Sequence, residues 1–498
     1  MADLKSESLP DDGINSSGII AVNGLTYKLP PDLSVAIQRN NQSQYFQAQG
    51  YSAGATAVCV FNTGASYVDM RRSYLAIDVS NDSTASDAKT ATNVWFGANG
   101  SACNLFNRVM LQTRSGAVIE RVDNANQLAS ARLYMEHGRD WCGDQLVSSQ
   151  YATYTGQTAT GTVPTATQEQ ILPLMGSAQV YGAAPNSNGT SDTFGEQWLT
   201  SGIRRFCIPL GELSPVCRYS QSLWPASLCS GLRLELLLEQ PGVALMSAVS
   251  GTDLLNYSIV NIRLVAECYQ LTDMALRVLN TMASTSALEV VSVTAHDTQA
   301  TRLAASINVD SGRACSRALA YLYRERPARN GASSTANALF DYFATSQQNG
   351  DTTGSTSGFY ITQHQARVGA LYFPQQSILN SNGLAGWRQC SDEMYMVTLQ
   401  ALGCMGFEPR DVVTSPYKFR AERGNFYQSL ERSNVIDASG IPLSNSRLLS
   451  VQQVWNAYVA ANPSSSSTGK LGGPFLIDLF LFHSVLVRVY LSGANIEI

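Results

Sequence analysis

An alternation of leucines near the middle of the chain is the feature that most constrains the fold. Residues 232–239 read LRLELLLE, with leucine at every even position and a charged side chain at every odd position except Leu237. A period of two places successive side chains on opposite faces of a β-strand. The segment therefore predicts a strand that buries its leucines in the core between two sheets and turns its charges outward.

Short β-rich runs recur along most of the 498 residues, separated by stretches of Gly, Ser, Thr and Asn. Roughly seven or eight such runs precede Thr272 and a comparable number follow Leu288, a pattern typical of all-β sandwiches. Residues 1–40 lack periodicity, so we expect an N-terminal arm there. The chain then divides into two tandem β-sandwich domains, at 41–284 and 285–498.

A few short helices are expected between the strands, at residues 124–136, 272–283 and 387–403. The most apolar segment runs from Pro474 to Leu491 and contains Asp478, His483 and Arg488. A membrane span rarely carries three such side chains, so this segment does not predict a span. We interpret it as two strands that meet near His483.

The chain carries little charge for its size, and the kind of charge is unusual. Charged residues make up 14 % of the sequence, against about 25 % in soluble domains. Of the 33 basic residues, five are lysines (positions 5, 28, 89, 418 and 470) and the other 28 are arginines. Protein interfaces favour arginine over lysine. A GC-rich genome would also explain the arginine bias, but not the low total charge, which suggests that much of the surface is covered in an assembly.

The net charge of −5 argues against a general nucleic-acid coat, because neutralising phosphates requires basic patches. The first residues, MADLKSESLPDDG, do not form a signal peptide. Ten cysteines are scattered without a C-x-x-C pair, which predicts free, buried thiols in a reducing compartment. They are Cys59, Cys103, Cys142, Cys207, Cys217, Cys229, Cys268, Cys315, Cys390 and Cys404.

No catalytic, cofactor-binding or metal-binding residues are predicted. His137, His296, His364 and His483 lie far apart, and none has metal-ligand spacing to a cysteine or a second histidine. Residues 354–358, GSTSG, place Thr356 where a serine nucleophile would stand. The segment SSTGKLGG at 466–473 has leucine after the lysine, where a phosphate loop needs Ser or Thr. We therefore expect no enzyme; the alternative is a β-sandwich that binds or cleaves carbohydrate with a pair of carboxylates.

Four blocks carry a resemblance to a known family. Residues 105–135 combine a strand, a Ser115-Gly116 turn, a second strand and a short helix. Residues 205–269 contain FCIPL, a loop with the sequence LWPA and the strand GLRLEL, and two further blocks lie at 366–378 and 425–449. In this order they resemble the double jelly-roll major capsid proteins of polinton-like viruses, virophages and adintoviruses. Trp224 departs from the residue that usually precedes this proline, which leaves the branch of the family open.

The resemblance implies two tandem jelly rolls per chain and a homotrimeric capsomer that tiles an icosahedral shell. It implies as partners the chain itself, neighbouring capsomers, a penton, and minor or cement capsid proteins. It implies no sequence-specific nucleic-acid binding and no membrane span, and it places the protein in the virion after synthesis in a host cell. The loop that precedes the leucine strand would then serve contact rather than chemistry.

Overall fold

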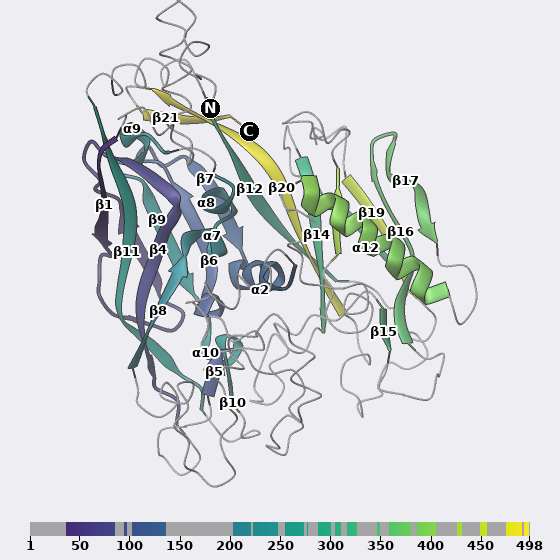
Figure 1. The fold of residues 1–498 in the computed structure, drawn as a ribbon. Coiled ribbons are helices and arrows are strands. Elements are labelled where there is room, and N and C mark those ends of the chain that lie inside the picture. The colour runs from purple at the N-terminus through teal and green to yellow at the C-terminus, as the bar shows by residue number, and fades with distance from the viewer. Residues whose placement is uncertain are drawn as a thin grey trace, which may run out of the picture.

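Two β-sandwiches stand side by side in the computed structural model of the chain (Figure 1). The structure describes residues 36–84, 94–96, 102–135, 203–220, 223–247, 254–272, 276, 287–299, 304–309, 316–325, 346–348, 358–379, 386–404, 426–430, 449–455, 475–490 and 493–497. Strands dominate these residues, and the helices among them are mostly single turns. The all-β fold class predicted from the sequence is confirmed.

The first sandwich is built from two antiparallel sheets. One sheet has the strand order β1 (Ala36–Tyr45), β11 (Tyr257–Leu271), β4 (Tyr67–Asn81) and β8 (Ile203–Pro209), with β2 (Tyr51–Ser52) also on β11. The other has the order β3 (Thr56–Val60), β9 (Arg233–Leu238), β6 (Phe106–Gln112) and β7 (Val118–Asp123). A small pair of β5 (Val94–Phe96) and β10 (Leu245–Ser247) lies apart from both sheets.

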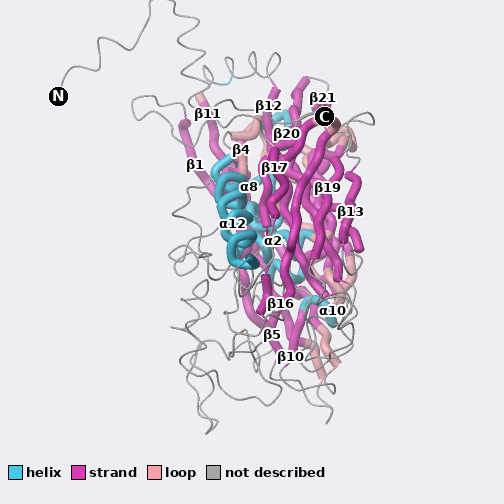
Figure 2. Tube along the Cα trace, turned by 90° about the vertical axis from the view of Figure 1, so that its right-hand side faces the viewer, coloured by secondary structure: helices cyan, strands magenta, loops and turns pink. Residues whose placement is uncertain are grey.

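The second sandwich repeats this plan. Its first sheet has the order β12 (Ala287–Gln299), β20 (Phe475–Tyr490), β14 (Ser316–Glu325) and β18 (Phe426–Ser429), with β21 (Gly493–Glu497) also on β20. Its second sheet joins β13 (Ala304–Val309), β19 (Leu449–Trp455), β16 (Gly358–Val368), β15 (Ser346–Gln348) and β17 (Leu371–Leu379). Figure 2 looks onto the side of this second sheet.

The two sandwiches share one topology. When the eight main strands of each are counted along the chain, the first sheet pairs them in the order 1-8-3-6 in both halves. The second sheet pairs strands 2, 7, 4 and 5 in both halves. Two four-stranded sheets connected in this way form a jelly roll. The chain is therefore a double jelly roll, as the resemblance implied.

The alternating leucines predicted the central strand of the first sandwich correctly. β9 lies between β3 and β6, and Leu234 stands opposite Cys59 on one neighbour and Leu111 on the other. Leucines 232, 234, 236 and 238 are all buried, whereas Arg233 is exposed; Glu239, which the alternation placed on the outward face, lies beyond the end of β9 and is buried. Leu237, which breaks the alternation, lies on the outer face and is half-buried.

The two helices predicted at 124–136 and 387–403 are confirmed as α2 (Ala125–Met135) and α12 (Gly386–Cys404). They occupy equivalent places: α2 follows β7 and α12 follows β17, each the fifth strand of its jelly roll. The helix predicted at 272–283 lies almost entirely outside the described residues.

The prediction of two strands meeting near His483 is wrong. β20 is one continuous strand, and its pairing with β12 passes through His483 without interruption. Residues 478 to 483 are buried on both faces of the strand. A strand covered on both faces is apolar throughout rather than alternating. Without alternation, the sequence pattern does not show that the segment is a single strand.

The first strand begins inside the predicted arm. β1 starts at Ala36 and pairs with β11 up to Tyr45. Its sequence, AIQRNNQSQY, is polar and lacks alternation because it is an edge strand. Residues 1–35 of the predicted arm lie outside the described residues, and the domain bounds at 40 and 284 stay predictions.

Candidate assembly interface

Of the four histidines, the structure describes the side chains of two, and Thr356 and residues 466–473 lie outside the described residues. His364 and His483 are buried in the second sandwich; burial lowers the pKa of His364 to about 4, although its Nε2 lies 3.0 Å from the Gln428 side-chain oxygen. His137 lies outside the described residues, and only the backbone of His296, on β12, is described. Within the described ranges, no three His, Cys, Asp or Glu side chains gather as a metal site would require.

The described part of the chain holds no helix long and apolar enough to cross a bilayer. All six cysteines whose side chains are described are free thiols, as predicted. Five of them are buried, and Cys207 is half-buried. The two sandwiches of the chain contact each other.

The junction between the sandwiches brings together the edges of two non-equivalent sheets. β7, an edge of the second sheet of the first sandwich, lies against β12, an edge of the first sheet of the second. Beside it, the Tyr219 ring meets the Phe482 ring of β20 edge to face, with centroids 6.3 Å apart. Ala318 and Ala320 of β14 share the face of Phe480 and Phe482 and are fully buried. This face packs against the first sandwich, so both faces of the sheet are covered.

The segment that precedes β9 fills this junction. It contains three helical turns: α7 (Leu210–Leu213), α8 (Pro215–Arg218) and α9 (Ala226–Cys229). Ser214 caps α8 by accepting a hydrogen bond from the Cys217 backbone N–H, and Pro215 opens the helix. Trp224 is fully buried and donates its indole N–H to the Ser220 hydroxyl at 2.9 Å. The contact that the structure gives this segment is internal, since α8 lies against β12.

A buried polar cluster forms hydrogen bonds with the same segment. The Glu120 carboxylate on β7 accepts hydrogen bonds from the Ser214 hydroxyl and from the Val216 backbone N–H, the latter at 3.1 Å. Burial raises the pKa of Glu120 to about 7, although these hydrogen bonds and the charge of Arg132 act in the opposite direction. Arg132, on α2, donates to the Gly211 carbonyl at 2.9 Å and places its guanidinium 5.7 Å from the Tyr219 ring centre. The cluster thus ties α2 to the residues at the junction.

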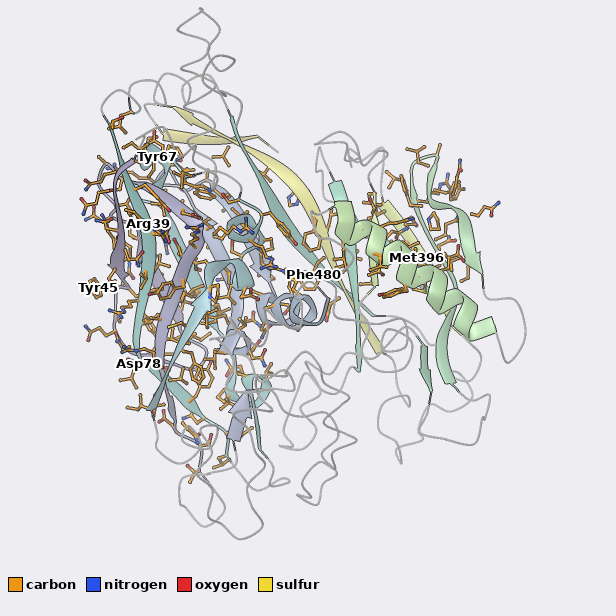
Figure 3. All side chains as sticks on the ribbon, viewed as in Figure 1. Arg39, Tyr45, Tyr67, Asp78, Met396 and Phe480 are labelled. Atoms are coloured by element: carbon orange, nitrogen blue, oxygen red, sulfur yellow. The ribbon has the colours of Figure 1, made fainter. Side chains whose placement is uncertain are left out.

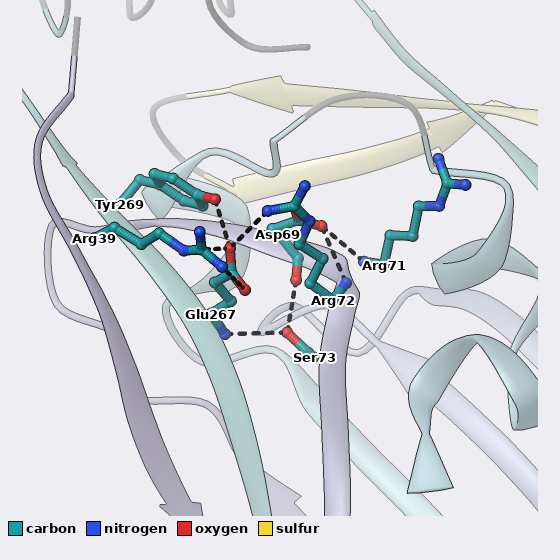
Figure 4. Close-up of polar contacts among 7 residues, drawn as sticks. All are labelled: Arg39, Asp69, Arg71, Arg72, Ser73, Glu267 and Tyr269. Carbon is teal, nitrogen blue, oxygen red and sulfur yellow. Dashed lines mark hydrogen bonds and ion pairs between the residues drawn. The ribbon is translucent and has the colours of Figure 1, made fainter. Parts of the chain in front are cut away.

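The outer face of the first sheet carries a network of arginines and carboxylates (Figure 4). Arg39 of β1 pairs with Glu267 of β11 at 2.9 Å, and the Tyr269 hydroxyl donates to the same carboxylate. Arg72 of β4 approaches Glu267 at 3.5 Å and Asp69 at 3.7 Å. Three strands are cross-linked by these contacts, while Arg39 and Arg72 remain about half exposed.

A β-bulge in β4 exposes Arg71 and Arg72. The register between β4 and β11 jumps from Tyr74 opposite Val265 to Asp69 opposite Glu267, so that residues 70–73 bulge from β4. The Asp69 carboxylate holds the bulge by accepting from the backbone N–H groups of Arg71 and Arg72, at 3.0 and 3.2 Å. Both arginine side chains are exposed as a result.

A second ion pair lies farther along the same face. Arg205 of β8 binds Asp78 of β4 through two hydrogen bonds, at 2.6 and 2.7 Å, and Asn261 adds a third at 3.2 Å. The hydrogen bonds and charge of Arg205 lower the pKa of Asp78 against a smaller opposing effect of burial. Tyr45, at the end of β1, is 66 % exposed. This face, defined by Arg39, Tyr45, Arg72, Asp78, Arg205 and Glu267, is called the outer face below.

Three large apolar side chains of the second sandwich are exposed, two on β17 and one on α12. Leu371 and Tyr372 of β17 and Met396 of α12 are 38 %, 42 % and 54 % exposed. Figure 3 places Met396 at the opposite end of the molecule from Arg39, Tyr45 and Asp78, with Phe480 between them. This set of three residues on β17 and α12 is called the far side below.

Sequence reasoning found neither surface. The outer face depends on register and on a bulge, which bring together residues from β1, β4, β8 and β11 that are up to 228 positions apart. The residues of the far side are ordinary apolar residues in the sequence, and their exposure depends on the tertiary packing.

The fold resembles virus capsid proteins in solved structures. The TM-score is 0.54 to a chain of the PBCV-1 virus capsid, with 9 % identity over 95 % of this chain and 99 % of that one. It is 0.55 to the Faustovirus major capsid protein, with 10 % identity, 93 % of this chain and 92 % of that one. It is 0.54 to a chain of the Sputnik virophage, with 9 % identity, 95 % of this chain and 90 % of that one.

No protein-family model and no curated protein matches the sequence. At identities this low, the likeness concerns the fold. It extends over nearly the whole of both chains, and it confirms the double jelly roll that the sequence blocks indicated.

Proposed function

We propose that this chain is a major capsid protein that forms homotrimeric, pseudo-hexagonal capsomers, which tile an icosahedral virus shell. The fold supports this proposal, because capsid proteins of three viruses share it over at least 90 % of their length. The low charge and the scarcity of lysine also support it, since they suit a chain whose surface is largely covered.

The observation that supports a trimer is that the contact between the two sandwiches is head-to-tail. The fifth strand of the first jelly roll, β7, meets the first strand of the second, β12. The two jelly rolls have the same topology, and among the described residues no other sandwich lies against the first strand of the first jelly roll, β1, or the fifth strand of the second, β17. A head-to-tail contact that repeats with rotation closes into a ring. Three chains supply six jelly rolls, the number that a pseudo-hexagonal ring requires.

The remaining parts of the proposal follow from the capsid role. The partners are further copies of the chain, neighbouring capsomers, a penton, and minor or cement proteins, and the location is the virion. The chain has no catalytic or cofactor role in this proposal and no sequence-specific contact with nucleic acid. The net charge of −5 supports the last point.

Native mass spectrometry of the purified chain tests the proposal. A dominant ion at three times the chain mass of 53.7 kDa is expected at micromolar concentration, and negative-stain images should show particles with a hexagonal outline. A stable, soluble monomer under the same conditions would contradict the capsomer. It would favour the carbohydrate-active sandwich, which glycan-array binding would then examine.

A further inference from the structure

Two polar side chains meet inside the second sandwich, at strand positions where the alternation calls for apolar residues. On β16, His364 shares the inward face with Ala366 and Val368, and all three are buried. On β18, Gln428 is 1 % exposed and shares its face with Leu430, which is also buried. The two strands belong to different sheets, so the contact between His364 and Gln428 joins the sheets across the interior of the sandwich.

The side-chain amide of Gln428 is bound at both of its polar atoms. Its oxygen accepts a hydrogen bond from the Tyr321 hydroxyl of β14 at 2.8 Å and lies 3.0 Å from His364 Nε2. Its nitrogen donates to the Phe373 carbonyl of β17. These contacts join β14 and β18 of one sheet to β16 and β17 of the other. The four residues are called the Gln428 cluster below.

The cluster determines where the histidine ring carries its hydrogen. An amide oxygen accepts and has no proton to donate, so His364 Nε2 must be the donor. Nδ1 is then the atom that would bind a second proton. Burial lowers the pKa of His364 to about 4, against a smaller opposing effect of the Gln428 hydrogen bond. A second proton would place a positive charge in the interior of the sandwich, which is costly.

The described carboxylates on the elements around the ring face away from it. Asp478 is on the opposite face of β20, with Phe480, and Glu393 is exposed on α12. The Tyr321 ring meets the His364 ring edge to face, with centroids 5.4 Å apart, and a phenol is neutral below pH 7. The other titratable side chains described on these elements are His483 on the inner face of β20, Arg367 and Tyr372, which are exposed, and the half-buried Tyr395.

We infer that the Gln428 cluster is an acid-sensitive contact, which holds the two sheets of the second sandwich together while His364 is neutral and releases them when the ring binds a proton. Because the pKa of the folded ring is lowered, the stabilisation is complete above pH 6.5, the ordinary value, and is lost as the pH falls from there toward 4. β18 responds first, because it ends its sheet and pairs with β14 through four residues. α12, which packs against β18 and β16, loses support with it. The cluster lies within one chain, so its response to acid does not depend on a capsomer.

Amide hydrogen exchange at pH 7.5 and pH 5 tests the inference, with labelling times adjusted for the intrinsic effect of pH on exchange. In the wild-type chain, the opening constant of the peptide that contains residues 426–430 should rise about tenfold or more at pH 5. The peptide that contains β9 of the first sandwich should show no such rise. His364→Gln is the matched control, because its amide can donate to the Gln428 oxygen but does not titrate; its 426–430 peptide should show no rise either.

Exchange of the hydrogen on histidine ring carbon C2 supplies a second readout and needs no variant. Its rate follows the protonation of each ring, and mass spectrometry reads it on separate peptides for the four histidines. The midpoint for His364 should lie below about pH 5. A midpoint near 6.5, equal wild-type opening constants at the two pH values, or a rise in His364→Gln as large as in wild type overturns the inference. Should His364→Gln fail to fold, the ring midpoint and the wild-type opening constants decide.

Discussion

The rings of Tyr219 and Phe482 meet edge to face across the junction of the two sandwiches, with centroids 6.3 Å apart and planes inclined by 79°. One ring follows a helical turn of the first jelly roll, and the other lies on the central strand β20 of the second. Such a pair stabilises a contact beyond the area that it buries. The contact joins the two similar sandwiches to each other.

Phe482 should therefore stabilise the whole chain, because it lies at the junction and is fully buried. Phe482→Ala is expected to lower the free energy of unfolding by about 3–5 kcal/mol, the usual cost of removing a buried phenylalanine ring. Leu254→Ala, at an exposed position, should change it by no more than about 0.5 kcal/mol. Urea unfolding at one protein concentration measures both. Equal midpoints for the two variants would contradict the junction described above.

Leu234 and Arg233 test the alternation on adjacent positions of β9. Leu234→Asp places an unpaired charge in the core of the first sandwich, where the leucine is 2 % exposed. We expect a loss of about 4 kcal/mol or more and little soluble protein. Arg233→Ala removes an exposed ion pair with Glu235 at 3.2 Å, which is worth at most about 1 kcal/mol. Thermal melts that move equally for both variants would show that the two faces of β9 do not differ.

Glu120 should make stability depend on pH. Its pKa is raised to about 7 in the folded chain, mainly by burial, against 4.5 for an ordinary glutamate. The folded state therefore binds the proton more tightly, and this stabilisation is complete below pH 4.5 and is lost as the pH rises through 7. Its size is on the order of 3 kcal/mol.

Glu120→Gln is the matched control, because an amide can still accept from the Val216 N–H and bond to the Ser214 hydroxyl but does not titrate. The difference in unfolding free energy between wild type and Glu120→Gln should change between pH 5 and pH 8, with the wild type losing stability at the higher pH. A difference that stays constant over this interval would show that Glu120 does not titrate there.

The cysteines should behave as inert core residues. Burial raises the pKa of Cys59 and Cys217 to about 12 and that of Cys268 to about 11, which suppresses the reactive thiolate. Alkylation of the native chain at pH 8, followed by peptide mass spectrometry, should leave these three unmodified until denaturant is added. Reductant should not shift the melting temperature, since the described cysteines form no disulfide. A large shift would reveal a disulfide elsewhere in the chain and contradict the prediction of free thiols.

The sequence by itself determined the parts of the fold that depend on local pattern. The leucines of 232–238 alternate because one face of β9 meets water, and this alternation revealed both the strand and its buried side. The helices α2 and α12 were likewise predicted near their observed bounds. Each of these elements keeps the same face buried, so that its periodicity can be recognised without knowledge of its neighbours.

Tertiary structure decided the rest. β20 carries no alternation because the second sandwich covers one of its faces and the first sandwich covers the other. β1 resembles a loop because its apolar neighbours lie on β11, more than 200 positions away, and its own edge faces outward. The outer face arises where register and a bulge align Arg39, Arg72 and Glu267 on three strands. Long-range pairing creates these features, and a local sequence pattern contains no information about which distant strand will become the neighbour.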